Sequence, residues 1–183
     1  RPDCIINIVD ATNLERNLYL TTQLMEIDVP VIVALNMMDA VEKSGDRIDA
    51  KELERKIGVP VAEISALKGN GIKELMDRAI KISKLPRKGE TVLKNSPIAH
   101  LIQDVAIALE SQNVAAPLFH AVKLSEMDEI EAAMHPELMP MVDRYKETFS
   151  DDTFGTDFEA IVADARYRYI SANYASVFRK EKG

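Results

Sequence analysis

Residues 31–39 have the sequence VIVALNMMD, in which five apolar residues are followed directly by polar ones. Two more short apolar runs, residues 4–9 (CIINIV) and 59–64 (VPVAEI), also end next to polar residues. Runs of this length and composition are typical of strands buried on both faces of a parallel sheet. Apolar residues at helical spacing predict helices near the runs, over 14–27, 50–57 and 72–83. The alternation of strand and helix predicts an α/β fold with a parallel sheet.

The pattern changes near residue 84. Residues 85–96 contain Pro, Gly and mixed charge, which indicates a linker. After the linker, apolar residues recur at helical spacing from Ile98 to Leu109, and no comparable strand run follows. Further helices are predicted over 117–133, over 136–148 and from Asp157 onward. The sequence therefore predicts an α/β domain over 1–84, a linker over 85–96 and an all-α domain over 97–183.

Composition excludes several classes of function. The 183 residues carry a net charge of −7, which argues against a binder of duplex DNA or other nucleic acid. Cys4 is the only cysteine, so a disulfide framework or a cysteine-built zinc site is excluded. No apolar run reaches the roughly 18 residues that a membrane crossing needs. The chain opens on a strand-like segment with no signal peptide and no Met, and we expect it to be a piece of a longer protein.

The polar residues that follow the predicted strands suggest a nucleotide site, since open parallel sheets bind ligands at the carboxyl ends of their strands. Asn36 and Asp39 have the spacing Asn-x-x-Asp. A carboxylate can accept both the N1–H and the 2-amino group of guanine, a donor pair that adenine lacks. Ser65, Ala66 and Leu67 follow the next strand, where their backbone N–H groups could face the guanine O6 and the Ser65 hydroxyl could brace Asp39. The combination predicts guanine recognition, whereas Asn-x-x-Asp alone is weak because strand ends favour Asn and Asp anyway.

Other candidate sites have simpler explanations. The three histidines are far apart in sequence, so no metal site is predicted from them. The methionines near residue 139 are typical of core filling, and the acidic run over 126–131 is typical of a solvated helix face. We therefore predict no metal ligands in this chain.

The motifs resemble those of a known family. Asn36-Met37-Met38-Asp39 is similar to the N-K-x-D guanine motif of translation-factor-related GTPases, and Ser65-Ala66-Leu67 is similar to their S-A-K/L element. Residues 9–20 (VDATNLERNLYL), 30–39, 65–72 and 161–170 resemble the ferrous iron transport protein B family, FeoB. Met at position 37, where most GTPases have Lys, is common in that family. The resemblance implies that residues 1–84 form the C-terminal half of a GTPase domain, and that 97–183 form a helical spacer similar to a dissociation-inhibitor module.

The resemblance also implies a function. In the intact parent, GTP binding and hydrolysis would be coupled to Fe²⁺ uptake through a membrane permease domain, at the cytoplasmic face of the bacterial cell membrane. Asn36, Met37, Asp39, Ser65, Ala66 and Leu67 would hold the guanine of GTP or GDP. No G-x-x-x-x-G-K-[ST] phosphate loop occurs in these 183 residues. We therefore expect this piece alone to hydrolyse no GTP, to contain no catalytic residues, and to lack the Mg²⁺ expected in the intact protein.

Two alternatives stay open at this stage. A ribosome-associated or translation-type GTPase would share the guanine motif but would not be expected to carry the helical part. A non-enzymatic helical interaction module would show no preference for GDP over ADP.

One consequence for stability also follows from the resemblance, because the strand over 4–9 would lack its usual neighbour. Its unpaired apolar edge predicts marginal stability or self-association.

Overall fold

The computed structural model describes residues 2–180, which divide into two compact units. Unit 1 contains residues 1–21, 29–87 and 169–183, and unit 2 contains 22–28 and 88–168. Each unit is thus assembled from segments that are distant in sequence. The linear division expected from the sequence differs at two places, because residues 22–28 group with the helical unit and residues 169–183 group with the α/β unit.

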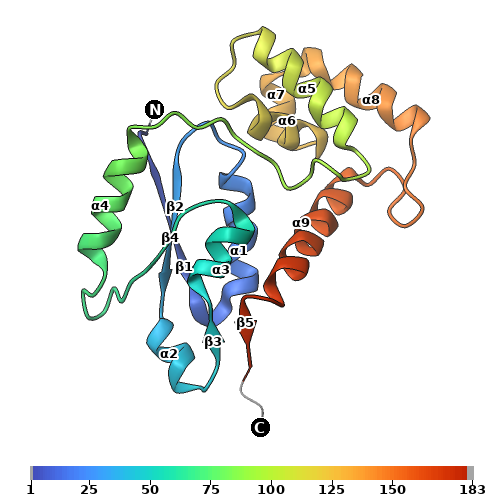
Figure 1. Cartoon of the computed structure of the whole chain (residues 1–183). Helices are drawn as coiled ribbons and strands as arrows, with labels where there is room; N and C mark the ends of the chain where they lie inside the picture. Colours follow the sequence, from blue (N-terminus) through green and yellow to red (C-terminus); the bar gives the residue numbers. More distant parts are fainter. Residues whose placement is uncertain (1, 181–183) are drawn as a thin grey trace. The chain divides into compact units, whose positions relative to one another are not determined.

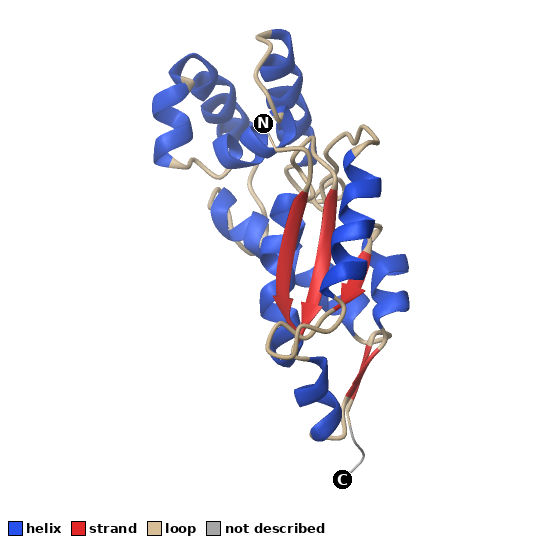
Figure 2. Cartoon of the chain, turned by 90° about the vertical axis from the view of Figure 1, so that its left-hand side faces the viewer, coloured by secondary structure: helices blue, strands red, loops and turns tan. Residues whose placement is uncertain are grey.

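Unit 1 is built on a three-stranded parallel sheet, as the sequence predicted (Figures 1 and 2). The strands are β1 (Ile5–Asp10), β2 (Val31–Asn36) and β4 (Val61–Glu63), in the order β1-β2-β4. β2 lies in the centre, and its residues 31–35 are fully or almost fully buried, which explains why this run is continuously apolar. In register, Ile5 pairs with Val31 and Val33 pairs with Val61.

Helices cover both faces of this sheet (Figure 1). α4 (Ile72–Ser83) lies on one face, where Leu75 and Ala79 pack with Ile32 and Ala34. α1 (Leu14–Leu24) and α3 (Ala50–Ile57) lie on the other face. α3 begins at Asp49, whose side chain accepts a hydrogen bond from the Glu52 amide, and ends at Gly58 with a φ of 74°. The predicted bounds of α3 and α4 are those observed.

Several short elements of unit 1 carry no periodic signal and were not predicted. They are η1 (Ala11–Asn13), α2 (Met38–Lys43), β3 (Arg47–Ile48) and β5 (Phe178–Arg179). β3 and β5 pair antiparallel, and the Asp49 amide donates to the Val177 carbonyl at 2.9 Å. Residues 178–179 therefore add a short strand to the α/β unit, although the helices of unit 2 precede them in sequence.

Unit 2 is all-α over the residues that the structure describes. Its helices are α5 (Ala99–Ser111), α6 (Pro117–Ser125), α7 (Glu129–Met134), η2 (Pro136–Leu138), α8 (Met139–Thr148) and most of α9 (Phe158–Tyr174). Leu101, Val105, Val122 and Phe158 are among the residues of its core. The single helix predicted over 117–133 is wrong, because Met127 has a φ of 64° and the Asp128 side chain caps a new helix. No described helix combines the length and the apolarity needed to cross a membrane.

Candidate functional site

The candidate site lies at the carboxyl ends of β2 and β4, where the two predicted loops meet. Asn36 is the last residue of β2, and its Oδ1 accepts a hydrogen bond from the Ala66 amide at 3.1 Å. These residues are 30 positions apart in sequence, so this bond connects the two strand ends directly. Of the three predicted backbone donors, the Ala66 N–H is therefore already used and the Ser65 N–H donates to the Asn70 carbonyl, which leaves the Leu67 N–H for an incoming ligand.

Met37 and Asp39 follow Asn36 on the turn into α2. Met37 is in the left-handed region with a φ of 72°, and its side chain is 40% exposed. This conformation is uncommon for a residue other than glycine and occurs most often at functional turns. It lets the chain reverse within one residue, so that Asp39 lies in the first turn of α2. The negative carboxylate is also favoured at that end of a helix.

The loop over residues 65–70 is closed by its own hydrogen bonds. The Ser65 amide donates to the Asn70 carbonyl at 2.9 Å, and the Lys68 amide donates to Ser65 Oγ at 3.3 Å. Ser65 therefore stabilises its own loop, and the described residues show no bond from its hydroxyl to Asp39 as the sequence had suggested. Leu67 lies at the tip of the loop with its side chain 93% exposed.

Lys68 contacts the site in a way that sequence reasoning missed. Its Nζ lies 3.7 Å from Asp39 Oδ2, with the two side chains 59% and 41% exposed. The sequence signal that could have indicated this is the single basic residue directly after Ser-Ala-Leu. An exposed pair of this kind contributes little stability, about 0–1 kcal/mol, so a ligand can displace the ammonium group from the carboxylate at small cost.

Gly71 fixes the position of this loop. It has a φ of 76° and precedes α4, and a Cβ built on it would overlap the Glu63 carbonyl oxygen of β4. Only glycine permits this close approach of the two backbones. The loop is consequently held against the strand end, with the Asn36, Asp39 and Ala66 groups on the same edge of the sheet.

A family model described as ferrous iron transport protein B matches residues 1–79. The structure is similar to a GDP-bound mutant of the S. thermophilus FeoB G-domain, with a TM-score of 0.83 and 31% identity. That alignment covers 98% of this chain and 70% of the other. This chain belongs to the ferrous iron transport protein B family. The structure of mGMPPNP-bound NFeoB from S. thermophilus gives a TM-score of 0.82 at 32% identity, covering 100% of this chain and 70% of that one.

Curated members of this family are much longer. The Fe²⁺ transporter FeoB of Escherichia coli K12 is 35% identical over 174 residues, which are 93% of this chain and 22% of the transporter. A Porphyromonas gingivalis protein that fuses Fe²⁺ transport protein A to FeoB is 32% identical over 98% of this chain and 23% of its own length. The chain thus spans less than a quarter of these relatives. The comparisons favour the iron-transport family over the two alternatives left open by the sequence.

Proposed function

We propose that this chain supplies the guanine-recognising edge of the GTPase domain of a FeoB-type Fe²⁺ transporter, with unit 2 as its helical spacer. The observation that carries the proposal is the 3.1 Å bond between Asn36 Oδ1 and the Ala66 amide. It holds the Asn-x-x-Asp turn and the Ser-Ala-Leu loop together with Asp39 beside them. Structures of the family bound to GDP and to mGMPPNP support a guanine nucleotide as the ligand.

The proposed recognition uses four groups of this chain. Asp39 accepts N1–H and the 2-amino group through its two oxygens, after Lys68 has moved away from Oδ2. Because Asn36 Oδ1 is occupied, its Nδ2 is the atom that donates to an acceptor on the purine, such as N7. The Leu67 amide is left to donate to O6. The exposed side chains of Met37 and Leu67 supply apolar surface for the two faces of the ring.

The intact transporter would couple GTP hydrolysis to Fe²⁺ uptake through a membrane permease domain, at the cytoplasmic face of the bacterial cell membrane. The Mg²⁺ that accompanies a nucleoside triphosphate is held largely by phosphate oxygens and by the Ser or Thr of a phosphate loop, and no such loop sequence occurs in these 183 residues. No group of three or more His, Cys, Asp or Glu side chains that could hold a metal occurs among the described residues. We therefore assign this chain the recognition of the base, and no step of phosphate chemistry.

A titration with nucleotides that differ only at the base tests this assignment. GDP, IDP and ADP are added to the 183-residue chain at millimolar concentration, and binding is followed by NMR shifts of the Asn36, Ala66 and Leu67 amides. GDP is expected to bind more tightly than IDP, which lacks the 2-amino group, by about 10- to 150-fold, since one hydrogen bond to a charged group contributes about 1.5–3 kcal/mol. ADP is expected not to shift these amides.

The matched control is Glu42→Ala. Glu42 is an exposed carboxylate on the same helix as Asp39, so both substitutions remove one negative charge from α2. Asp39→Ala should abolish the preference for GDP, and Glu42→Ala should preserve it. Equal affinity for GDP and ADP in the unsubstituted chain would refute guanine recognition.

A further inference from the structure

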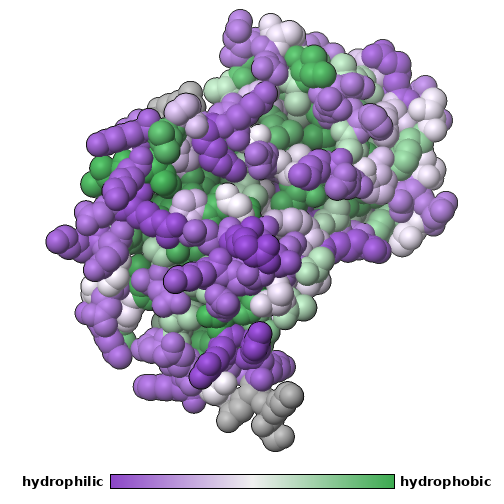
Figure 3. Space-filling model, in the orientation of Figure 1, coloured by the Kyte–Doolittle hydropathy of each residue, from purple (hydrophilic) through white to green (hydrophobic). Residues whose placement is uncertain are grey.

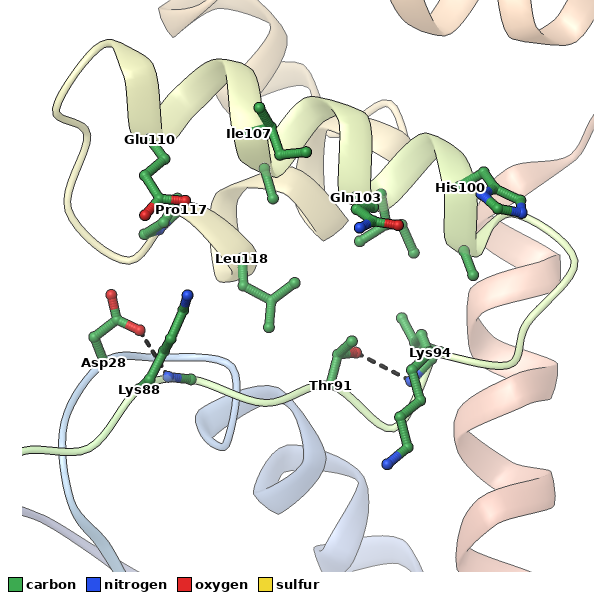
Figure 4. A pocket seen from close by; sticks show the side chains of 15 residues that line it. Asp28, Lys88, Thr91, Lys94, His100, Gln103, Ile107, Glu110, Pro117 and Leu118 are labelled. Carbon is green, nitrogen blue, oxygen red and sulfur yellow. Dashed lines mark hydrogen bonds between the residues drawn. The ribbon is translucent and has the colours of Figure 1, made fainter.

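Unit 2 contains a cavity that guanine recognition does not use. It has a volume of about 500 Å³ and lies between α5 and the extended segment 88–94 (Figure 4). This volume is within the range of small-molecule sites, roughly 300–1,000 Å³. Its lining residues all belong to unit 2, and none of them belongs to the guanine site.

The body of the cavity is apolar. Ile102, Ala106 and Ile107 line it from α5, and Pro117 and Leu118 line it from the start of α6. Figure 4 shows Leu118 between the helix and the extended segment. Ile107 is 57% exposed although it is a large apolar residue, so a ligand in the cavity would cover surface that now faces solvent. Covering such surface is favourable by about 25 cal/mol per Å².

The opposite wall is held in place by hydrogen bonds. The Gly89 amide donates to Asp28 Oδ1 at 2.7 Å, and the Glu90 amide donates to the Met25 carbonyl at 2.8 Å. Thr91 Oγ1 donates to Glu26 Oε2 at 2.7 Å and accepts from the Leu93 amide at 3.0 Å. These bonds fix the extended segment to residues 25–28, so binding would require little further ordering of the chain.

Charge is distributed unevenly along the cavity. Lys94 and His100 lie at one end, and Asp28, Lys88 and Glu110 lie at the other (Figure 4). Neither Lys94 nor His100 forms an ion pair with any of the residues 2–180. The same end contains the amino terminus of α5, which has no acidic residue in its first turn. The cavity therefore carries positive charge at the Lys94 end, and charges of both signs at the Glu110 end.

We propose that this cavity is a binding site for a small amphiphilic carboxylate. Its apolar chain lies along α5 against Ile107 and Leu118, and its carboxylate lies at the Lys94 end. Gln103 lines the middle of the cavity and offers a neutral hydrogen-bonding group between the two regions. The ligand is a soluble anion with one charged head, because one end of the cavity is positive, whereas at the other end two carboxylates outnumber Lys88 and disfavour a second negative group.

The test uses decanoate as the carboxylate and 1-decanol as its uncharged counterpart, each titrated into the full 183-residue chain. Binding is followed by NMR shifts of the Gly89, Thr91 and Gln103 amides. Decanoate is expected to bind at least threefold more tightly than decanol at low salt. Lys94→Glu should weaken decanoate at least fivefold and leave decanol unchanged, since it reverses only the charge at the head-group end.

Two matched variants separate the specific effect from general ones. Lys84→Glu makes the same change at an exposed lysine outside the cavity and should leave both ligands unaffected. Ile107→Ser should weaken both ligands equally, whereas Ile130→Ser, at an apolar residue on α7 that is 73% exposed, should weaken neither. Melting curves establish that each variant is folded. Equal binding of decanoate and decanol, unchanged decanoate binding in Lys94→Glu, or shifts confined to residues outside the cavity would each overturn the proposal.

Discussion

Arg166 Nη2 donates to Glu26 Oε1 at 2.9 Å, and both side chains are only 1% exposed. The two residues are 140 positions apart in sequence and belong to the same compact unit. Arg166 Nη1 also donates to Thr22 Oγ1 at 3.2 Å, and Thr91 Oγ1 donates to the second oxygen of Glu26. This buried network explains why residues 22–28, which contain the last residues of α1 and the turn after it, are part of the helical unit.

Arg166→Met is expected to lower the free energy of unfolding by about 3–5 kcal/mol, because it leaves the Glu26 carboxylate buried without its ion-pair partner. The double variant Arg166→Met, Glu26→Met should recover most of this loss, since it replaces both charges with apolar groups. Urea denaturation followed by circular dichroism measures the three stabilities. A single variant as stable as the parent would contradict the importance of the pair.

Gly71→Ala should disrupt the proposed guanine site, because the added Cβ would overlap the Glu63 carbonyl oxygen. The matched control is Gly69→Ala. Gly69 has a similar φ of 73° but no atom within 4 Å of its Cβ position, so only backbone strain of about 1–2 kcal/mol is expected there. Gly71→Ala should therefore reduce both the melting temperature and GDP binding by more than Gly69→Ala does. Equal effects of the two substitutions would mean that backbone strain, and not the close contact with β4, is the reason why position 71 requires glycine.

Asp39→Asn should change the preferred base from guanine to xanthine. Xanthine has a carbonyl where guanine has the 2-amino group, and an asparagine amide can donate to that carbonyl while its oxygen still accepts from N1–H. The variant is expected to bind XDP more tightly than GDP, reversing the order of the parent. Competition between the two nucleotides, measured by NMR, distinguishes the outcomes. Loss of binding to both would indicate that Asp39 acts on the loop and not on the base.

Glu126→Gln should change the dependence of stability on pH. Burial raises the pKa of Glu126, against the lowering effects of Arg166 and Lys123, while Glu26 and Glu159 raise the pKa further. When a carboxyl group has a higher pKa in the folded state, the unfolded chain loses its proton first as pH rises. Glu126 therefore lowers stability progressively above about pH 4.3, the ordinary glutamate pKa, and has no effect below it. Melting temperatures should coincide near pH 4 and favour the variant as pH rises, until the folded carboxyl group is ionised too and the difference stays constant.

Ile8→Lys is expected to reduce self-association of the chain. Among the described residues β1 pairs only with β2, and Ile8 is 63% exposed on the face that α4 covers in part. Hydrophobic surface is also visible over the upper part of α4 (Figure 3). A lysine on an edge strand disfavours pairing with a second sheet. Sedimentation velocity at several concentrations measures the effect. Leu20→Lys, at an exposed leucine outside the sheet, should leave association unchanged, and a larger effect there would contradict the role of the edge.

The sequence by itself determined the α/β class, the succession of strands and helices along unit 1, and the positions of the Asn-x-x-Asp and Ser-Ala-Leu motifs at the strand ends. These follow from local patterns, since a short, continuously apolar run such as residues 31–35 is typical of a strand buried on both faces, and a parallel sheet brings the polar residues after its strands to one edge. Tertiary structure decided which segments share a unit and which side chains meet. The Arg166–Glu26 pair, the pairing of β5 with β3 and the approach of Lys68 to Asp39 depend on contacts between residues far apart in sequence. No periodicity or motif along the chain encodes such contacts, because they are selected by burial and pairing only after the elements have formed.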